Sequence, residues 1–391
     1  MRLNKLWAAA LLLASPLALA QAPQEFKVGV VASMSGVYGV GGKQLQNGIN
    51  AFLKLNGDEV AGRKVRVIYR DTAGPNPEVA KRVAQELLTR DKVDVLAGFD
   101  FTPTALAVAP LVTQAKKPLI VMNAATSIIT ERSPFIVRTS FTSAQTSYPM
   151  GQWAARNGLK NVYVTVADFA PGHEAATWFK KAFTEAGGNI VGEVALPIVN
   201  SDYGPFLQRV RDTKPDAVFA FLPVGEPVIL YYKAWAEKGL DKAGIKLIAP
   251  EGWVDPDVLR IAGEASAGAI STGFYTPSNT TRQNQDFLKA YAEVAGEKMD
   301  ANYLAVGAYD GMALIFDALK KTSGDADGEK LFQAMKGASL PSPRGVMAID
   351  PETRDVINTV YVRKVDMVDG VPVAMDFDQI EAVKDMGKGA H

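Results

Sequence analysis

The chain has 391 residues, with 42 Lys and Arg against 42 Asp and Glu, two histidines and no cysteine. The lack of cysteine excludes disulfides, thiolate catalysis and cysteine zinc sites. The balanced charge provides no basic field that would attract nucleic acid. We therefore expect no metal, no cofactor and no nucleic-acid partner, and the length is typical of two domains.

The first twenty residues have the layout of a secretory signal peptide. A basic start at 1–5 precedes an apolar run from Leu6 to Leu13, and Ala18 and Ala20 place small residues at the −3 and −1 positions of a cleavage site. The run is shorter than the ~20 apolar residues that cross a bilayer. We predict cleavage after Ala20 and export of a protein that, lacking a cysteine at that point, is not a lipoprotein.

Beyond the signal peptide, short β-branched runs alternate with helical patterns. The predicted strands are 26–32, 65–69, 93–97 and 119–122, followed by 162–166, 190–196, 217–222 and 247–249. Between them lie apolar side chains at helical spacing, as at Leu45, Ile49 and Phe52. This alternation indicates parallel sheets with helices on both faces.

The last third of the chain continues the pattern with longer helices. A strand at 270–275 is followed by helical stripes at 287–294 and 306–319, and then by a hairpin-like pair of strands at 346–349 and 356–365. We interpret the strand at 270–275 as a crossing back to the first lobe.

The alternation occurs twice, with a break near 135–150, and this predicts two doubly wound α/β lobes. The N-terminal lobe is predicted to comprise 26–140 and 273–345, and the C-terminal lobe 141–272 and 346–391. In such sheets ligands bind beyond the carboxyl ends of the strands. The loops that follow the strands are therefore the places to look for function.

The Gly-rich loop after the first strand fails both nucleotide-binding patterns. Gln44 stands where a dinucleotide fingerprint needs Gly or Ala, and also where a P-loop needs Ser or Thr after Lys43. Val37 occupies the position of the first P-loop glycine. We interpret the loop as a place where the backbone passes close to another group.

Two later loops offer hydroxyl groups. Thr102 is placed to cap a helix that starts at Pro103, and a helix N-terminus with a free hydroxyl also binds carboxylates. Ala124 permits close approach of a ligand, and Thr126 adds a hydroxyl. Plain capping at Thr102 and a plain polar turn at 123–127 remain the alternatives.

In the second half, Glu251 follows a strand among Pro, Gly and Trp. It is suited to accept hydrogen bonds from a ligand ammonium, or to form a loop salt bridge. Trp253 is suited to cover the apolar part of a ligand or to make a cation–π contact. Phe169 fits either a pocket wall or the core, and His173, without metal partners, fits a surface or packing role.

The inventory for enzyme chemistry is poor. The sequence contains one histidine besides terminal His391, no H-E-x-x-H and no G-x-S-x-G. We expect a binding protein rather than an enzyme, with an exported α/β enzyme as the competing hypothesis.

Taken together and in order, these segments resemble the leucine/isoleucine/valine-binding family of type I periplasmic solute-binding proteins. The segments are FKVGVVASMSG at the start, GFDFTPT at 98–104, NAATS at 123–127, APEGW at 249–253 and IAGEASAGAISTGFY at 261–275. The resemblance implies two lobes joined by a three-strand hinge, with crossings near 140, 272 and 345.

The resemblance also implies a site. Hydroxyls and backbone N–H groups matching Thr102, Ala124 and Thr126 would hold a ligand carboxylate, and Glu251 would hold an α-ammonium. This chain departs from the family where Phe101 replaces a polar residue and Pro171 replaces a tyrosine. Some relatives bind aromatic carboxylates, which Phe101, Phe169 and Trp253 would suit.

The function implied is the periplasmic binding component of an ABC importer. Hinge closure would capture a branched-chain amino acid or a similar small carboxylate, and the closed form would dock on an inner-membrane permease. An aromatic carboxylate is the alternative ligand, and a sensory role is an alternative to transport. We expect a periplasmic monomer.

Overall fold

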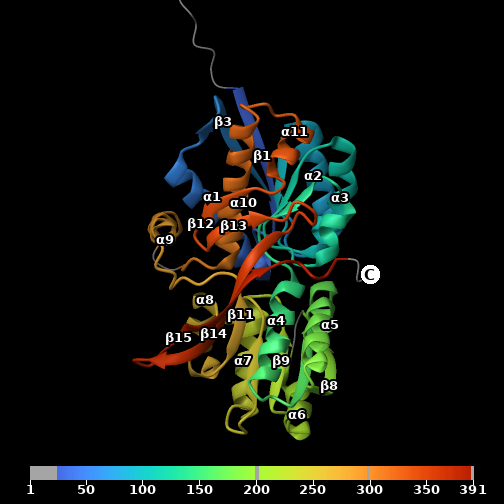
Figure 1. The fold of residues 1–391 in the computed structure, drawn as a ribbon, viewed down its shortest axis with the longest axis vertical. Coiled ribbons are helices and arrows are strands. Elements are labelled where there is room, and N and C mark those ends of the chain that lie inside the picture. The colour runs from blue at the N-terminus through green and yellow to red at the C-terminus, as the bar shows by residue number, and fades with distance from the viewer. Residues whose placement is uncertain (1–23, 199–201, 297–298, 389–391) are drawn as a thin grey trace, which may run out of the picture.

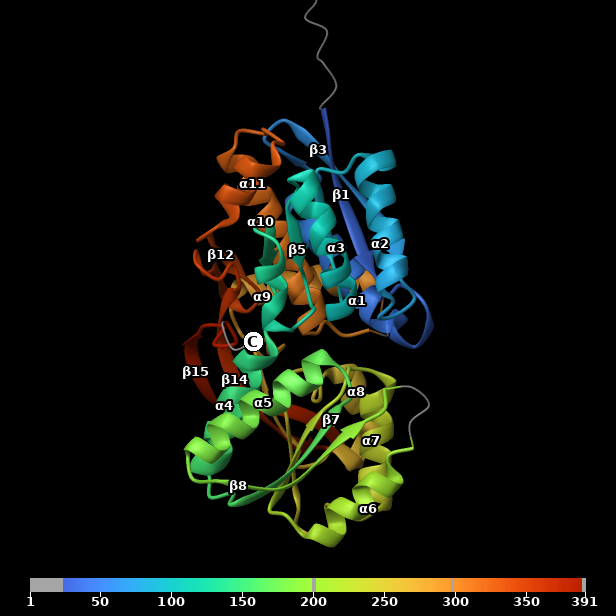
Figure 2. The ribbon, with the colours of Figure 1, turned by 90° about the vertical axis from the view of Figure 1, so that its right-hand side faces the viewer.

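The computed structural model describes residues 24–198, 202–296 and 299–388. Two α/β lobes lie one above the other, and extended segments connect them (Figures 1 and 2). The predicted signal peptide lies outside the described residues. Among the residues that are described, no helix is long and apolar enough to cross a membrane.

The N-terminal lobe is built on a six-stranded sheet with strand order β2-β3-β1-β4-β5-β6, parallel apart from the short β2. Its strands are β1 (Gln24–Ala32), β2 (Glu59–Val60), β3 (Arg63–Asp71), β4 (Val95–Gly98), β5 (Leu119–Val121) and β6 (Ile136–Arg138). Its helices are α1 (Gly39–Asn56), α2 (Pro77–Glu86), α3 (Thr102–Ala115), α9 (Arg282–Ala295), α10 (Tyr303–Lys321) and α11 (Gly328–Met335), with short turns of helix at η1 (Gly36–Tyr38), η2 (Leu87–Asp91) and η3 (Ser127–Arg132). One core lies between the sheet and α1, α9, α10 and α11, and a second lies under α2 and α3.

The C-terminal lobe has a larger mixed sheet, ordered β12-β13-β14-β11-β10-β9-β7-β8, with β15 paired to β14. The strands of this sheet are β7 (Asn161–Ala167), β8 (Asn189–Leu196), β9 (Ala217–Phe221), β10 (Lys246–Ala249), β11 (Ile270–Gly273), β12 (Ser339–Ser342), β13 (Gly345–Ile349), β14 (Val356–Val368) and β15 (Val371–Val383). β12 and β13 extend the sheet onto the N-terminal lobe (Figure 1). Its helices are α4 (Ser143–Arg156), α5 (Ala170–Glu185), α6 (Gly204–Thr213), α7 (Glu226–Glu237) and α8 (Pro256–Ala262), with the turn η4 (Gly263–Ser266). The strands from β7 to β11 pair in parallel, as predicted.

The third crossing between the lobes lies later in the chain than the sequence suggested. Met347 and Ile349 of β13 belong to the core of the N-terminal lobe, whereas Val362 and Val365 belong to that of the C-terminal lobe. The crossing therefore runs through β14 itself rather than near 345. One continuous strand serves both lobes, so its sequence carries no break to mark the boundary.

The C-terminal hairpin was only half predicted. β13 and β14 pair antiparallel, with Ile349 opposite Val356, as the expected hairpin-like pair requires. β15, which pairs with β14 for most of its length, was not predicted. Most of its side chains are exposed, so it lacks the buried β-branched run that marks the other strands.

Candidate ligand-binding site

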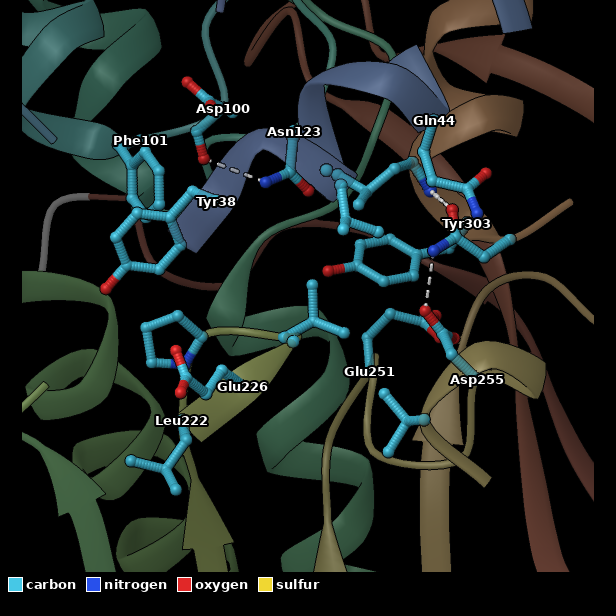
Figure 3. A pocket seen from close by; sticks show the side chains of 18 of the residues that line it. Tyr38, Gln44, Asp100, Phe101, Asn123, Leu222, Glu226, Glu251, Asp255 and Tyr303 are labelled. Atoms are coloured by element: carbon cyan, nitrogen blue, oxygen red, sulfur yellow. Dashed lines mark hydrogen bonds between the residues drawn. The ribbon is translucent and has the colours of Figure 1, made fainter. Parts of the chain in front are cut away.

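A cavity of about 300 Å³ lies between the two lobes, at the carboxyl ends of their strands. Both lobes contribute to its wall, as Figure 3 shows for ten labelled residues. Six aromatic side chains line it: Tyr38, Phe101, Phe141, Phe169, Phe221 and Tyr303. Tyr38 packs edge-on against Phe101, with ring centroids 4.8 Å apart. The wall is mainly apolar and aromatic, as in sites for small organic molecules.

Several helices begin at the cavity wall. Lining residues lie in the first turns of α1, α3, α5, α7 and α10: Gly41, Thr102, Pro171, Glu226 and Tyr303. Helix N-termini carry a partial positive charge and unpaired N–H groups. Among the residues that the structure describes, no Lys or Arg lines the cavity. An anion in the cavity would therefore be held by backbone and hydroxyl donors.

Glu251 lines the cavity, but a cation within the protein already balances its negative charge. Arg363 of β14 donates from Nη2 to Glu251 Oε1 at 2.8 Å, and both side chains are almost wholly buried. The backbone N–H of Phe274 donates to the other carboxylate oxygen at 2.6 Å. A buried carboxylate paired in this way has its counter-charge within the protein.

Polar contacts close the far end of the cavity across the two lobes. Asn302, which caps α10, donates to Asp255 Oδ2 at 2.9 Å, and Gln44 donates to Asp257 Oδ2 at 3.1 Å. Burial, assisted by the negative charge of Glu251, raises the pKa of Asp255 well above its usual range. A raised pKa favours the uncharged form of Asp255.

The part of the cavity wall that belongs to the N-terminal lobe contains two buried side-chain oxygens that accept no hydrogen bond from the described residues. Asp100 accepts the backbone N–H of Ser33 at 2.9 Å, and Asn123 donates from Nδ2 to the Asp100 carbonyl oxygen at 2.8 Å. Asp100 Oδ1 and Asn123 Oδ1 are buried without a partner. Burial is the main cause that raises the pKa of Asp100 to about 6.

The sequence profile of the periplasmic binding protein family matches residues 25–370. The chain belongs to this family. The fold is the type I periplasmic binding protein fold, and the protein is a solute-binding protein of an ABC transporter, not an enzyme. As a periplasmic binding protein it is exported, binds a small molecule and delivers it to an ABC permease.

Similar proteins cover nearly the whole chain. A solute-binding protein of an ABC transporter from Rhodopseudomonas palustris BisB5, solved in complex with 3,4-dihydroxybenzoic acid, is 50% identical, with a TM-score of 0.89 over 93% of this chain and 99% of that one. One from Rhodopseudomonas palustris HaA2, in complex with p-hydroxybenzoic acid, is 41% identical, with a TM-score of 0.91 over 94% and 100%. The Leu/Ile/Val-binding protein homolog 6 of Brucella melitensis biotype 1 (strain ATCC 23456 / CCUG 17765 / NCTC 10094 / 16M) is 40% identical over 88% of each chain.

The structure of this binding protein brings four of the predicted site residues together at the cavity: Phe101, Thr102, Phe169 and Glu251. Thr102 is not the cap of α3, because that helix begins at Thr102 and Phe101 precedes it. The Thr102 hydroxyl instead lies 2.7 Å from that of Thr126. Glu251 forms the salt bridge that was the alternative to ammonium binding.

The other three predicted residues do not line the cavity. The backbone N–H of Ala124 donates to the Phe99 carbonyl at 2.9 Å, and Thr126 lies behind Thr102. Trp253 is 1% exposed and packs edge-on against Tyr231 and Tyr232. Its loop turns the indole into the core of the C-terminal lobe, so it does not cover a ligand, contrary to expectation.

Sequence reasoning did not predict the roles of Tyr38, Asn123, Asp255 and Tyr303. Asn123 and Asp255 follow predicted strands, and that position was the available signal. The Gly-rich loop does allow a close approach, because a Cβ on Gly42 would lie 2.1 Å from the carbonyl oxygen of Ser33. Gly42 therefore allows α1 to pack closely against its own entry loop.

Proposed function

We propose that this protein captures an aromatic carboxylate, specifically a hydroxylated benzoate. The observation that carries the proposal is the cavity, which six aromatic side chains line and which no Lys or Arg lines in the described part of the chain. Arg363 already balances the charge of Glu251. Two relatives at 50% and 41% identity are in complex with 3,4-dihydroxybenzoic acid and p-hydroxybenzoic acid, which supports the choice.

The carboxylate of such a ligand fits the first turn of α3, beside the Thr102 hydroxyl. Helix N-terminal N–H groups stabilise an anion by roughly 0.3–2 kcal/mol through the helix dipole. The benzoate ring fits against the side chains of Tyr38, Phe101 and Phe169, where aromatic pairs add about 0.5–1.5 kcal/mol beyond their burial. The raised pKa of Asp255 favours its uncharged form, which lessens repulsion of the anion.

A branched-chain amino acid is the second candidate. The observation that favours it is the name of the 40% identical Brucella relative, a Leu/Ile/Val-binding protein homolog. This ligand would bring an ammonium to Glu251, where Arg363 already supplies a positive charge 2.8 Å away. If that ligand binds nevertheless, Glu251→Gln lowers leucine affinity, and unchanged affinity for every amino acid tested excludes the role of Glu251.

A thermal-shift screen tests the proposal. It compares 4-hydroxybenzoate, 3,4-dihydroxybenzoate and benzoate with leucine, isoleucine and valine, at equal concentrations. At one hundred times the dissociation constant a ligand stabilises the folded state by about 2.7 kcal/mol. We expect stabilisation by the hydroxybenzoates, reduced in Phe101→Ala and Phe169→Ala. Stabilisation by the three amino acids and by none of the aromatic acids would overturn it, and so would chemical turnover of the ligand.

The mature form is also part of the proposal. We expect cleavage after Ala20, because Ala18 and Ala20 place small residues at the cleavage site. We expect no lipid anchor, since the chain has no cysteine, and no affinity for nucleic acid, since its charge is balanced. We also expect a monomer. The intact mass of the exported protein and its light scattering after gel filtration test the cleavage site and the monomer. An intact mass that does not correspond to a chain starting at Gln21 contradicts the predicted cleavage site. A dimer in light scattering contradicts the predicted monomer.

A further inference from the structure

Asn123 presents a fixed hydrogen-bond acceptor to the cavity. It follows β5 and reaches across to the loop after β4, where its Nδ2 donates to the carbonyl oxygen of Asp100 at 2.8 Å (Figure 3). A carbonyl oxygen only accepts, so this bond determines which end of the amide faces it. Asn123 Oδ1 is therefore left as the free end, and it is buried without a partner in a residue that lines the cavity.

A buried acceptor without a donor costs about 1–3 kcal/mol. No side chain among the described residues donates to Asn123 Oδ1, and the carboxylate of a benzoate has no hydrogen to donate. A ring hydroxyl does, because a phenol donates its O–H while the ring stays in the apolar part of the cavity.

We propose that Asn123 Oδ1 accepts a hydrogen bond from a ring hydroxyl of the ligand, and so selects hydroxylated benzoates over benzoate itself. This inference rests on the proposed function. Asp100 does not share the role, because its carboxylate bonds the Ser33 N–H and points away from the other labelled side chains in Figure 3.

The experiment measures the affinities of wild type and Asn123→Leu for 4-hydroxybenzoate, 3-hydroxybenzoate and benzoate by isothermal titration calorimetry. Leu is close to Asn in size and removes the acceptor. We expect wild type to prefer at least one hydroxybenzoate over benzoate by about tenfold or more, and Asn123→Leu to lose that preference while keeping its affinity for benzoate. Leu222→Ala, which alters another cavity-lining residue without removing a polar group, should keep the preference.

The outcomes separate the two proposals. Wild type that binds none of the three acids overturns the proposed function. Wild type that binds them, with equal loss for all three in Asn123→Leu or with an unchanged preference, overturns the role of Asn123 alone.

A second inference rests on Glu174, one turn into α5 beyond the cavity-lining Pro171. Its carboxylate crosses to the N-terminal lobe, where both oxygens accept the backbone N–H of Ser127, at 3.0 and 3.1 Å, and one lies 2.5 Å from Ser127 Oγ. Ala175 and Phe179 anchor the same helix in the C-terminal lobe core. The contact with Ser127 therefore exists only while the lobes are closed.

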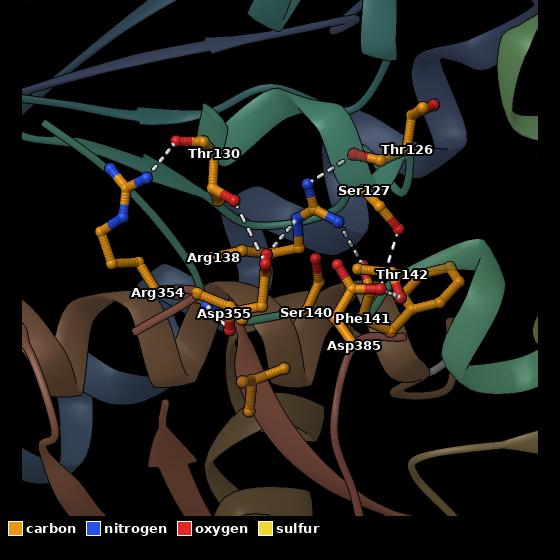
Figure 4. A network of polar contacts seen from close by, with 12 residues as sticks. Thr126, Ser127, Thr130, Arg138, Ser140, Phe141, Thr142, Arg354, Asp355 and Asp385 are labelled. Carbon is orange, nitrogen blue, oxygen red and sulfur yellow. Dashed lines mark hydrogen bonds and ion pairs between the residues drawn. The ribbon is translucent and has the colours of Figure 1, made fainter. Parts of the chain in front are cut away.

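The Ser127 hydroxyl has a single hydrogen, and this limits the protonation states of the acids around it. Ser127 Oγ lies 2.5 Å from Glu174 and 2.8 Å from Asp385 Oδ1, but it has one hydrogen to donate. Asp385 Oδ1 also accepts from the Thr142 hydroxyl at 2.9 Å (Figure 4). It accepts from the Gly387 N–H at 2.9 Å as well. Asp385 Oδ1 thus accepts three hydrogen bonds, one of which uses the Ser127 hydrogen, and the 2.5 Å contact between Ser127 Oγ and Glu174 needs a proton from Glu174.

We propose that lobe closure takes up one proton at Glu174, so that ligand binding is coupled to protonation. In the open form Glu174 returns to water and ionises, and in the closed form it donates to Ser127 Oγ. Burial is the main cause that raises the pKa of the closed-form carboxyl to about 7.

The other charged groups around Glu174 are consistent with a protonated Glu174 carboxyl in the closed form. They are Asp385, Asp355, Arg138 and Lys388. The two cations are already engaged: Arg138 with Asp355 at 3.4 Å, and Lys388 with Asp355 at 2.8 Å and Asp385 at 3.5 Å. No cation in the described structure forms an ion pair with Glu174.

Calorimetry in two buffers of different ionisation enthalpy, phosphate and Tris, counts the protons taken up when 4-hydroxybenzoate binds. At pH 7 we expect wild type to take up about half a proton and Glu174→Gln close to none, with the ligand still bound. Glu185→Gln alters an acid on the same helix and should behave as wild type. Equal uptake in wild type and Glu174→Gln would overturn the inference.

If 4-hydroxybenzoate does not bind, another hydroxybenzoate that does bind replaces it, and the ligand-free protein tests the proton independently of any ligand. Small-angle scattering at pH 6 and pH 8 should then show a smaller radius of gyration at pH 6 in wild type, and no difference in Glu174→Gln. The same radius at both pH values in wild type would contradict the coupling.

Discussion

The two lobes place a buried acid in the same cavity wall in opposite ways. In the C-terminal lobe, Arg363 holds Glu251 at 2.8 Å, and the Phe274 N–H donates to it at 2.6 Å. In the N-terminal lobe, Asp100 accepts the Ser33 N–H at 2.9 Å, and its other oxygen has no partner. One acid has a counter-charge behind the wall, whereas the other has only hydrogen bonds and a raised pKa of about 6.

The difference shows what an acidic residue in a pocket implies about its ligand. Glu251 was expected to need a ligand ammonium, yet its charge is balanced by a residue 112 positions along the chain. An acid that is already compensated does not require a cationic ligand. The charge of the pocket is therefore set by groups behind its surface as much as by those that line it.

The largest expected effect comes from removing the counter-charge of Glu251. Arg363→Met leaves Glu251 buried and unpaired, which should lower the free energy of unfolding by about 3–5 kcal/mol. Urea denaturation of the ligand-free protein measures it. The double variant Glu251→Gln with Arg363→Met removes both charges, and its glutamine still accepts the Phe274 N–H.

We expect the double variant to recover most of the lost stability, since buried ion pairs are replaceable by neutral groups of similar size. If the single and double variants are equally destabilised, the packing of Arg363 rather than its charge accounts for the loss. In that case the contrast with Asp100 would have no electrostatic basis.

The second effect is smaller and depends on pH. Asp100 has a raised pKa of about 6 in the folded protein, against its ordinary 3.8. The folded state therefore binds more protons than the unfolded state between these values, and the contribution of Asp100 to stability falls as the pH rises from about 4 to about 6. Over that window the loss amounts to about 2–3 kcal/mol.

Asp100→Asn tests this, because it removes the titration while keeping a similar shape. We expect the free energy of unfolding of wild type, relative to Asp100→Asn, to decline between pH 4 and pH 7. Other buried acids titrate in both proteins, so their effect cancels in the difference. A difference that does not change with pH would show that Asp100 is ionised in the fold without penalty.

The fold was far easier to predict from the sequence than the site. Strands such as 26–32 and 162–166 carry their own β-branched runs, and the order of strands and helices determines a doubly wound lobe. Thr102 and Glu251 were found because they follow strands. The partner of Glu251 could not be found in this way, since Arg363 reaches it only after β14 has crossed from one lobe to the other.

Trp253 shows the same difficulty for a residue that was predicted to line the site and does not. Its place after β10 indicated a cavity residue, but a loop side chain turns either way, and nothing local decides between the core and the ligand. Asn123 was equally close to residues that were singled out, yet its role depends on the carbonyl oxygen of Asp100 in a different loop. Contacts between loops that are distant in sequence are what the sequence does not show.

The smallest expected effect on the free energy of unfolding is at the exposed pair His173 and Asp168. This pair gives a lower limit against which the two buried acids are compared. The two side chains are 2.9 Å apart and more than half exposed. Water screens such a pair, so Asp168→Asn should change the free energy of unfolding by less than about 1 kcal/mol at any pH. Urea denaturation at pH 6 and pH 8 measures it beside Arg363→Met. A loss comparable to that of Arg363→Met would mean that burial is not what separates these acids, and the contrast between Glu251 and Asp100 would need another cause.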